Sequence, residues 1–157
     1  MKKIASFCVN HDKLDRGMYI SRTDGDVVTY DIRMKRPNGG DYLENGAMHT
    51  FEHLFATFAR NSGVSDEVVY VGPMGCRTGF YLLLRDSVGS EQAIALVKAA
   101  FAFIAEFEGE IPGSTRPECG NYLEHNLEGA RLAAADMLSV LDGWTADMLT
   151  YEYHGAN

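Results

Sequence analysis

An Asp-Gly dipeptide between two alternating segments is the feature that most constrains the fold of this chain. Asp24-Gly25 separates residues 17–23 from residues 26–34, and this dipeptide tolerates the positive φ of a two-residue hairpin turn. Because successive strand residues point to opposite faces, the second segment should bury one face, and Arg33 should point away from that core. The residues expected to face inward are Val28, Tyr30, Ile32 and Met34. The pattern predicts an antiparallel β-hairpin.

The rest of the chain contains further segments of strand-like and helix-like hydrophobic periodicity. Strands are expected at residues 67–71 and 79–85, joined by a glycine-bearing loop, and helices at about residues 47–61, 90–108 and 126–141. Ser90 is expected to cap the second helix. The simplest assembly is an α+β fold in which helices pack on an antiparallel sheet of about four strands. A chain of 157 residues predicts one domain spanning residues 1–157.

Composition excludes several classes of partner. The formal charge is -8, without a run of Lys or Arg, which disfavours binding to nucleic acid. Apolar runs all fall short of the roughly 20 residues that span a bilayer, and the start of the chain lacks the pattern of a secretory signal. The three cysteines are an odd number, which argues against a disulfide framework. We therefore expect a cytoplasmic protein without a membrane partner.

The segment 47–61 combines an apolar face with a possible metal site. On a helix, His49 and His53 lie one turn apart and project to the same side, with Glu52 next to both. The order His-x-x-Glu-His is the inverted zincin pattern, in which the histidines bind a metal and the glutamate moves protons. The alternative is two helical histidines satisfied by hydrogen bonds, but the spacing with an intervening glutamate favours the metal.

Two cysteines are candidates for the rest of such a site. A catalytic metal needs a third protein ligand and an open position. Cys119 is our choice, because a thiolate binds divalent metals strongly and the adjacent Gly120 permits close backbone approach; Glu128 is the rival. Cys76 lies in a turn-rich loop, where a thiol is often accessible. From the residues alone, two interpretations of Cys76 are equally good: a functional thiolate that acts as a base or a nucleophile, and an incidental loop cysteine.

Several motifs along nearly the whole chain belong together. They are Ser6-Phe7, His11, Asp31-Ile32-Arg33, Pro37-Asn38, His49-Thr50-Phe51-Glu52-His53, Pro73-Met74-Gly75-Cys76-Arg77-Thr78-Gly79, Cys119-Gly120, His125 and Leu127-Glu128-Gly129-Ala130. The combination of the inverted zincin helix with Pro-Met-Gly-Cys and a late Cys-Gly is specific. Through these motifs the chain resembles S-ribosylhomocysteine lyase, the autoinducer-2 synthase of bacteria.

The resemblance implies a homodimer with active sites at the subunit interface, each binding one Fe(II), with zinc or cobalt able to substitute. It assigns metal ligation to His49, His53 and Cys119. It also assigns acid/base roles to Cys76 and Glu52, support of the Cys76 thiolate to Arg33, and contacts from the neighbouring subunit to Ser6 and His11. For His125 we expect a structural or outer-sphere role rather than ligation. Cys8 receives no role, and His154 is expected to be solvated.

The implied reaction is a step of the methionine cycle. The carbonyl of S-ribosylhomocysteine moves from C1 to C2 and then to C3, which acidifies the C4 proton, and homocysteine then leaves by β-elimination to give 4,5-dihydroxy-2,3-pentanedione. A Lewis-acidic metal would stabilise the enediolates, and each of two proton shuttles would contribute about 10²- to 10⁴-fold. One departure is Tyr70, which stands where many members have an aspartate associated with holding the homocysteine end.

Two other functions remain as alternatives. An inverted-motif metallopeptidase would use Glu52 to activate water and Glu128 as the third ligand, but its domain is usually longer and it gives Cys76 no task. A metal-dependent binding module that carries or senses a small ligand would leave Cys76 a bystander. Release of thiol from S-ribosylhomocysteine distinguishes both from the lyase.

Overall fold

The hairpin expected around Asp24-Gly25 forms one edge of the sheet in the computed structural model, which describes residues 1–151. Strands β1 (Gly17–Asp24) and β2 (Val27–Arg33) pair antiparallel, and Gly25 takes a φ of 60° in the turn. Two more strands, β3 (Val68–Pro73) and β4 (Gly79–Arg85), complete the order β1-β2-β4-β3, with antiparallel neighbours throughout. The α+β prediction is confirmed. His154, which we expected to be solvated, lies outside the described residues.

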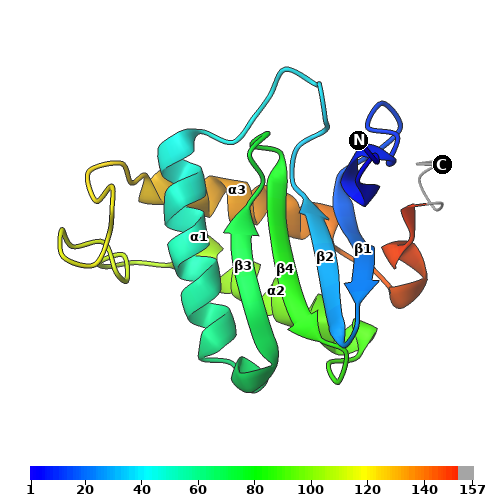
Figure 1. Ribbon diagram of the computed structural model, residues 1–157. Coiled ribbons are helices and arrows are strands. Elements are labelled where there is room, and N and C mark those ends of the chain that lie inside the picture. Colours follow the sequence, from blue (N-terminus) through cyan, green and yellow to red (C-terminus); the bar gives the residue numbers. More distant parts are fainter. Residues whose placement is uncertain (152–157) are drawn as a thin grey trace.

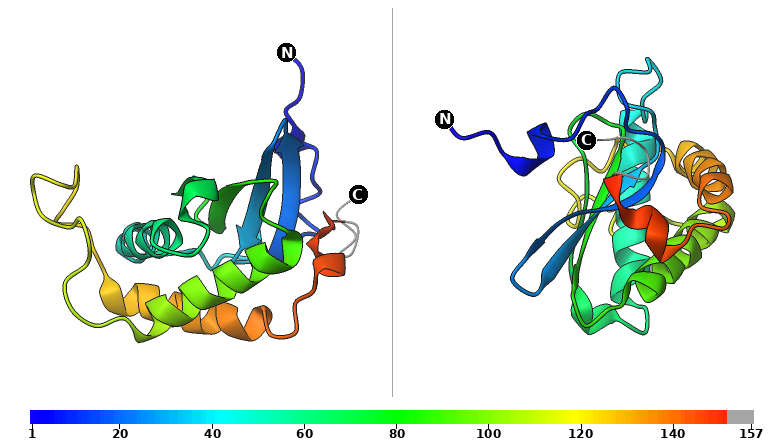
Figure 2. Two further views of the ribbon diagram at one scale, coloured as in Figure 1. Left: turned by 90° about the horizontal axis from the view of Figure 1, so that it is seen from below. Right: turned by 90° about the vertical axis from the view of Figure 1, so that its right-hand side faces the viewer.

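Three helices pack on this sheet. Helices α2 (Ser90–Glu106) and α3 (Leu127–Val140) cover one face, and α1 (Asn45–Arg60) runs along the β3 edge (Figures 1 and 2). Ser90 is the first residue of α2 rather than its cap, a position that Gly89 takes. The N-terminus of a different helix, α1, is capped by Glu44, whose carboxylate accepts hydrogen bonds from the N–H groups of Gly46 and Ala47 at 2.8 Å. These bonds lower the pKa of Glu44.

The apolar side of α1 anchors the helix in the core. Phe51 stacks on Phe80 of β4, with ring centroids 4.8 Å apart, and both Phe51 and Phe55 meet Phe101 of α2 edge-on. Phe51 and Phe55 are at most 1% exposed, and burial of such a ring contributes about 1.5–3 kcal/mol. The opposite side of α1, which carries His49 and His53, is thereby held at the surface.

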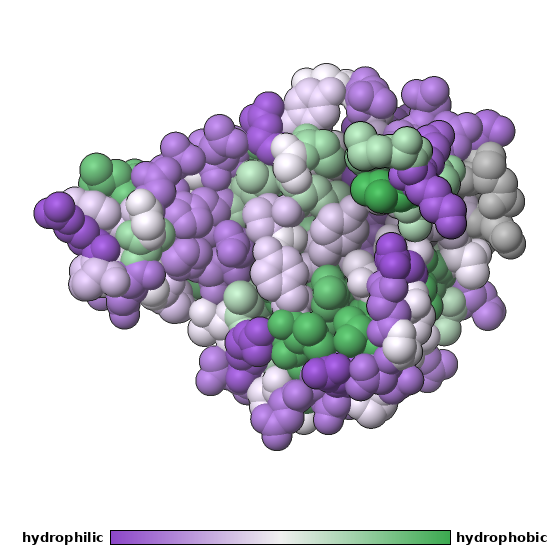
Figure 3. Space-filling view, viewed as in Figure 1, coloured by the Kyte–Doolittle hydropathy of each residue, from purple (hydrophilic) through white to green (hydrophobic). Residues whose placement is uncertain are grey.

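The other face of the sheet has no α-helix over it among the described residues, and only the short 3-10 helix η1 (Ala5–Phe7) borders the groove on this face. This face is turned towards the viewer in Figure 1, and Figure 3 shows apolar side chains gathered on it. Ile4 and Tyr70, which are 53% and 52% exposed, border a groove of about 460 Å³ on this face. Within residues 1–151, no helix combines the length and apolar character needed to cross a bilayer.

Candidate metal centre and thiol cluster

Helix α1 presents its two histidines to a loop that joins α2 to α3. Residues 107–126 contain neither helix nor strand, and they pass along the side of α1 away from the sheet (Figures 1 and 2). The loop supplies a backbone carbonyl to each ring: Nδ1 of His49 lies 2.7 Å from the Glu124 oxygen, and Nδ1 of His53 lies 2.8 Å from the Pro112 oxygen. An Nδ1–H donated to a carbonyl leaves Nε2 free for a metal, the usual arrangement of ligating histidines.

Cys119 meets both free nitrogens. Its Sγ lies 3.4 Å from Nε2 of His49 and 4.0 Å from Nε2 of His53. A tetrahedral ion with a sulfur ligand at about 2.3 Å and a nitrogen ligand at about 2.0 Å separates the two ligand atoms by about 3.5 Å. The three side chains therefore fit a divalent ion. The metal-ligand group formed by the described residues includes Cys119 and does not include Glu128, so the geometry favours Cys119 over its rival.

His125 is a fourth member of this group, although the sequence led us to expect a structural or outer-sphere role for it rather than ligation. The four ligand atoms of His49, His53, Cys119 and His125 all lie within 4.8 Å of one another. The His125 ring stacks on His49, with centroids 4.0 Å apart, and its Nε2 lies 3.9 Å from Cys119 Sγ. Burial lowers the pKa of His125, and the neighbouring His49 and His53 lower it further.

Glu52 lies on α1 between the two histidines and is partly exposed. Among the residues that the structure describes, its carboxylate has no hydrogen-bond or ion-pair partner, so both oxygens are available to a substrate. Gly120, beside Cys119, is exposed, and a Cβ at this position would meet nothing within 4 Å. The chain beside the thiol therefore leaves open space.

A second cluster surrounds Cys76 in the loop between β3 and β4. The exposed thiol of Cys76 lies 3.0 Å from Thr78 Oγ1 and 3.9 Å from Nη1 of Arg33, which donates to Thr78 Oγ1 at 2.7 Å. Arg77 adopts a φ of 60° in this turn, a conformation that is uncommon for a residue with a side chain. The loop thus holds a thiol against a fixed guanidinium group.

Arg33 points away from the core that Tyr30 and Ile32 enter, as strand alternation predicts, but this position on the other face of the sheet is buried rather than exposed. Arg33 is 3% exposed and Asp31 is 2% exposed. Arg33 donates from Nη2 at 2.7 Å and from Nε at 3.2 Å to the Asp31 carboxylate, which also accepts the Tyr151 hydroxyl at 2.7 Å. Burial opposes the charged form of Arg33, but the charge and hydrogen bonds of Asp31 outweigh burial and raise its pKa.

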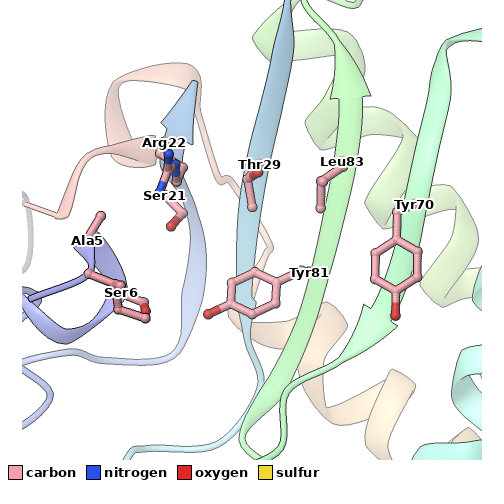
Figure 4. Close-up of a pocket in the computed structure, with 9 residues that line it drawn as sticks. Ala5, Ser6, Ser21, Arg22, Thr29, Tyr70, Tyr81 and Leu83 are labelled. Carbon is pink, nitrogen blue, oxygen red and sulfur yellow. The ribbon is translucent and has the colours of Figure 1, made fainter. Parts of the chain in front are cut away.

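The N-terminal segment brings Ser6 and His11 to this second cluster. His11 lines the same surface pocket as Arg33 and Cys76, and Ser6 joins His11 and Arg33 around a smaller cavity closed by Tyr151. On the open sheet face, Tyr81 points its hydroxyl towards Ser6 (Figure 4). Tyr70 lies over Gly72, where a Cβ would be 2.1 Å from the Tyr70 hydroxyl oxygen; the glycine makes room for the ring.

The metal-ligand group and the Cys76 cluster occupy different sides of the chain. Helix α1 lies between the Cys119 loop and the sheet (Figures 1 and 2). Within residues 1–151 the hydrogen bonds connect members of each cluster, and none runs from one cluster to the other. The structure therefore brings His49, His53 and Cys119 together, and separately brings Arg33, Cys76, Ser6 and His11 together.

The fold is α+β, and two imidazoles and a thiol are arranged for one metal ion. A second accessible thiol lies beside a buried arginine. Together these features define a class of metal-dependent enzyme. Comparison with known proteins identifies the family. The family model for S-ribosylhomocysteinase (LuxS) matches residues 4–148. The chain belongs to this family.

Similar proteins agree with this assignment over nearly the full length. An S-ribosylhomocysteine lyase of Phocaeicola vulgatus is 49% identical, over 96% of this chain and 98% of that protein. Proteins of the same name from Clostridium acetobutylicum and Borreliella afzelii are 47% and 45% identical, each over 96% of this chain and 99% of the relative.

Proposed function

We propose that this protein is a carbon–sulfur lyase that converts S-ribosylhomocysteine to homocysteine and 4,5-dihydroxy-2,3-pentanedione, the precursor of autoinducer-2. The observation that carries the proposal is the convergence of His49, His53 and Cys119, at Nε2–Sγ distances of 3.4 and 4.0 Å, in a chain of this family. One chain supplies a metal centre and a second thiol, which are the parts that the reaction needs.

The ligands in this proposal are His49, His53 and Cys119, and the ion is Fe(II), one per subunit, replaceable by zinc or cobalt. A mixed imidazole and thiolate set accepts several divalent ions. When bound, the ion supplies Lewis acidity that favours negative charge on the sugar oxygens. Metal analysis of protein purified without oxygen tests the identity of the ion; a centre filled stoichiometrically by zinc under those conditions would contradict iron.

Glu52 and Cys76 move the protons. Each carbonyl shift removes a proton from one carbon and returns one to its neighbour, and the elimination removes the C4 proton while the C5–S bond breaks and the homocysteine sulfur takes up a proton. Glu52 is free to accept protons beside the metal ligands. Cys76 acts on the other side of the sugar, where Arg33 stands 3.9 Å from its sulfur, and Ser6 and His11 contact the substrate.

The active protein is a homodimer with its sites at the interface. Two observations support this proposal. Within residues 1–151 no hydrogen bond joins the metal ligands to the Cys76 cluster, and the Cys119 loop lies on the side of α1 away from the sheet. The groove on the open sheet face has apolar lining from Ile4, Tyr70 and Leu83. Because Ser6 and His11 lie with Arg33 and Cys76, a partner that contributes the first two residues contributes the last two as well. Each site would combine the metal ligands of one subunit with the thiol cluster of the other.

Thiol release from S-ribosylhomocysteine tests the activity. The iron-loaded protein is expected to release homocysteine, and Cys76→Ala is expected to abolish release while leaving the metal content unchanged. Cys8→Ala is the matched control, because Cys8 is also exposed and its thiol donates to the Ile4 carbonyl at 3.6 Å. An inactive wild type, or a fully active Cys76→Ala protein, would overturn the proposal.

Subunit mixing tests the shared site. Cys76→Ala and Cys119→Ala proteins are each expected to be inactive, and co-expression of the two should restore about one quarter of wild-type activity, because half of the dimers are mixed and each contains one intact site. No recovery, or a monomer by light scattering, would contradict the interface site.

Metal retention by Cys119→Ala with loss of metal by Glu128→Ala would favour the metallopeptidase instead.

We also place the protein in the cytoplasm, without nucleic-acid or membrane partners. The three cysteines are free, and the proposed chemistry requires Cys76 and Cys119 to stay reduced, as they do in a reducing compartment. Fractionation of cells against a periplasmic marker checks this location.

A further inference from the structure

His125 stands close enough to the metal-ligand group to be a fourth ligand, and its hydrogen bond to Thr50 decides whether it can be one. Thr50 lies on α1 and is 0% exposed. Its Oγ1 accepts the backbone N–H of Asn126 at 2.9 Å and lies 2.9 Å from Nδ1 of His125. Among the residues that the structure describes, Thr50 Oγ1 has these two partners.

The direction of the Thr50–His125 bond follows from counting protons. Asn126 donates to Thr50, so the single hydroxyl proton of Thr50 must itself find an acceptor, and Nδ1 of His125 is the partner in reach. The opposite direction would leave a buried hydroxyl proton unpaired, which costs about 1–3 kcal/mol. Nδ1 therefore accepts, and the ring proton of His125 is on Nε2. A nitrogen that carries a proton cannot ligate a metal.

The ring planes lead to the same conclusion independently. An imidazole binds a metal along a lone pair that lies in its ring plane, about 2 Å from the nitrogen. The rings of His49 and His53 are 81° apart, so their planes cross and can share one ion. The rings of His49 and His125 are stacked only 21° apart with centroids at 4.0 Å. Planes so nearly parallel do not meet within ligand distance of both nitrogens.

The geometry points to His125 as a positioning residue that donates Nε2–H to the Cys119 thiolate, with Thr50 fixing its tautomer. The Nε2–Sγ distance of 3.9 Å suits this long bond to sulfur. A hydrogen bond to a ligating thiolate draws charge from the sulfur and makes the bound metal a stronger Lewis acid. His125 thereby leaves the fourth coordination position open to the substrate. The inference rests on the proposed metal centre and not on which substrate it serves.

Spectroscopy of the cobalt(II)-loaded protein tests this role without turnover. His125→Phe keeps a ring against His49 but has no N–H to donate. The thiolate-to-cobalt charge-transfer band is expected to move to lower energy, because the sulfur regains charge, while the d–d bands keep their intensity because the ligand set is unchanged. His125→Gln, which retains an N–H donor, is expected to remain closer to wild type. A changed d–d pattern in His125→Phe would show ligation and overturn the proposal.

Variants of Thr50 provide a second test that leaves the imidazole in place. Thr50→Ser keeps the hydroxyl and should preserve the wild-type spectrum, whereas Thr50→Val removes the donor to Nδ1 and should shift the charge-transfer band in the same direction as His125→Phe. An unshifted band in Thr50→Val would contradict the tautomer argument. Outer-sphere partners typically contribute about 10- to 100-fold to metal affinity or activity, so we expect a loss in that range for His125→Phe. If the spectra shift as expected but S-ribosylhomocysteine is not cleaved, the proposed substrate fails and the role of His125 stands.

Discussion

Replacing one partner of the Asp31–Arg33 pair is expected to destabilise the protein more than replacing both. The two side chains are 2% and 3% exposed, so Asp31→Leu leaves a buried guanidinium group whose remaining close partner is Thr78 Oγ1, at 2.7 Å. Loss of one partner of a buried ion pair costs about 3–5 kcal/mol. For a chain of this size, that loss lowers Tm by roughly 6–20 °C. Arg33→Met should cost a similar amount, because it leaves the buried Asp31 carboxylate without a cationic partner.

The double variant Asp31→Leu/Arg33→Met contains no buried charge and should be far less destabilised than the sum of the single variants. Its residual cost comes from the Tyr151 hydroxyl, which loses its acceptor at 2.7 Å, and is about 1–3 kcal/mol. Urea unfolding at pH 7 and saturating metal measures all three variants. Additive single costs would refute the reasoning.

An exposed pair serves as the control for this cycle. Lys35 and Asp41 lie 2.8 Å apart with side chains 22% and 78% exposed, and removal of either is expected to cost less than about 1 kcal/mol. The thiol-release assay then separates the two roles of Arg33, which are to pair with Asp31 in the folded protein and to place a cation beside Cys76. The double variant should recover stability without recovering activity, because it lacks the cation beside Cys76.

Three further changes test other parts of the molecule. Gly79→Ala places a Cβ 2.0 Å from the Ile32 carbonyl oxygen and should lower the free energy of unfolding in urea by about 3 kcal/mol or more. Gly75→Ala, in the loop that precedes β4, places a Cβ with nothing within 4 Å and should change stability by less than about 0.5 kcal/mol. Burial and then the charge of Asp31 raise the pKa of Tyr151, so above about pH 10 the folded state retains a phenol proton that the unfolded state releases. The free energy of unfolding should therefore fall as pH rises above about 10. Equal slopes of this free energy against pH in the wild type and in Tyr151→Phe would contradict the prediction. A chelator should lower Tm of the metal-loaded protein, by the equivalent of about 2.7 kcal/mol at a free metal concentration of 100 Kd, and should have little effect on Cys119→Ala.

The parts of the fold that sequence predicted are those that local periodicity determines. The helix expected at residues 47–61 is observed as Asn45–Arg60, because Phe51 and Phe55 recur with the helical period that also aligns His49 with His53. Cys119 could be proposed as a ligand only from the chemistry of thiolates and from the family resemblance. Its approach to α1 depends on the carbonyls of Pro112 and Glu124, and no local pattern encodes those contacts.

Two residues show why the contacts within the site could not be predicted, although roles for both residues were expected. His125 reaches the metal-ligand group because Asn126, at the start of α3, donates to the Gly46 carbonyl at 3.1 Å and to Thr50, a docking of two helices far apart in the chain. Arg33 was placed on the correct face by alternation. Its burial depends on Tyr151, more than a hundred positions later, whose hydroxyl binds Asp31.

The irregular segment between α2 and α3 carries Cys119 together with both carbonyls that orient the histidines. A chain segment without helix or strand has few internal hydrogen bonds to hold it in place. An ion bound by Cys119, His49 and His53 would therefore hold this segment against α1. We expect limited proteolysis to cut residues 107–126 rapidly in apoprotein and slowly in loaded protein. Cellular lifetime would then follow metal supply, and starvation for the ion would remove the idle enzyme by degradation.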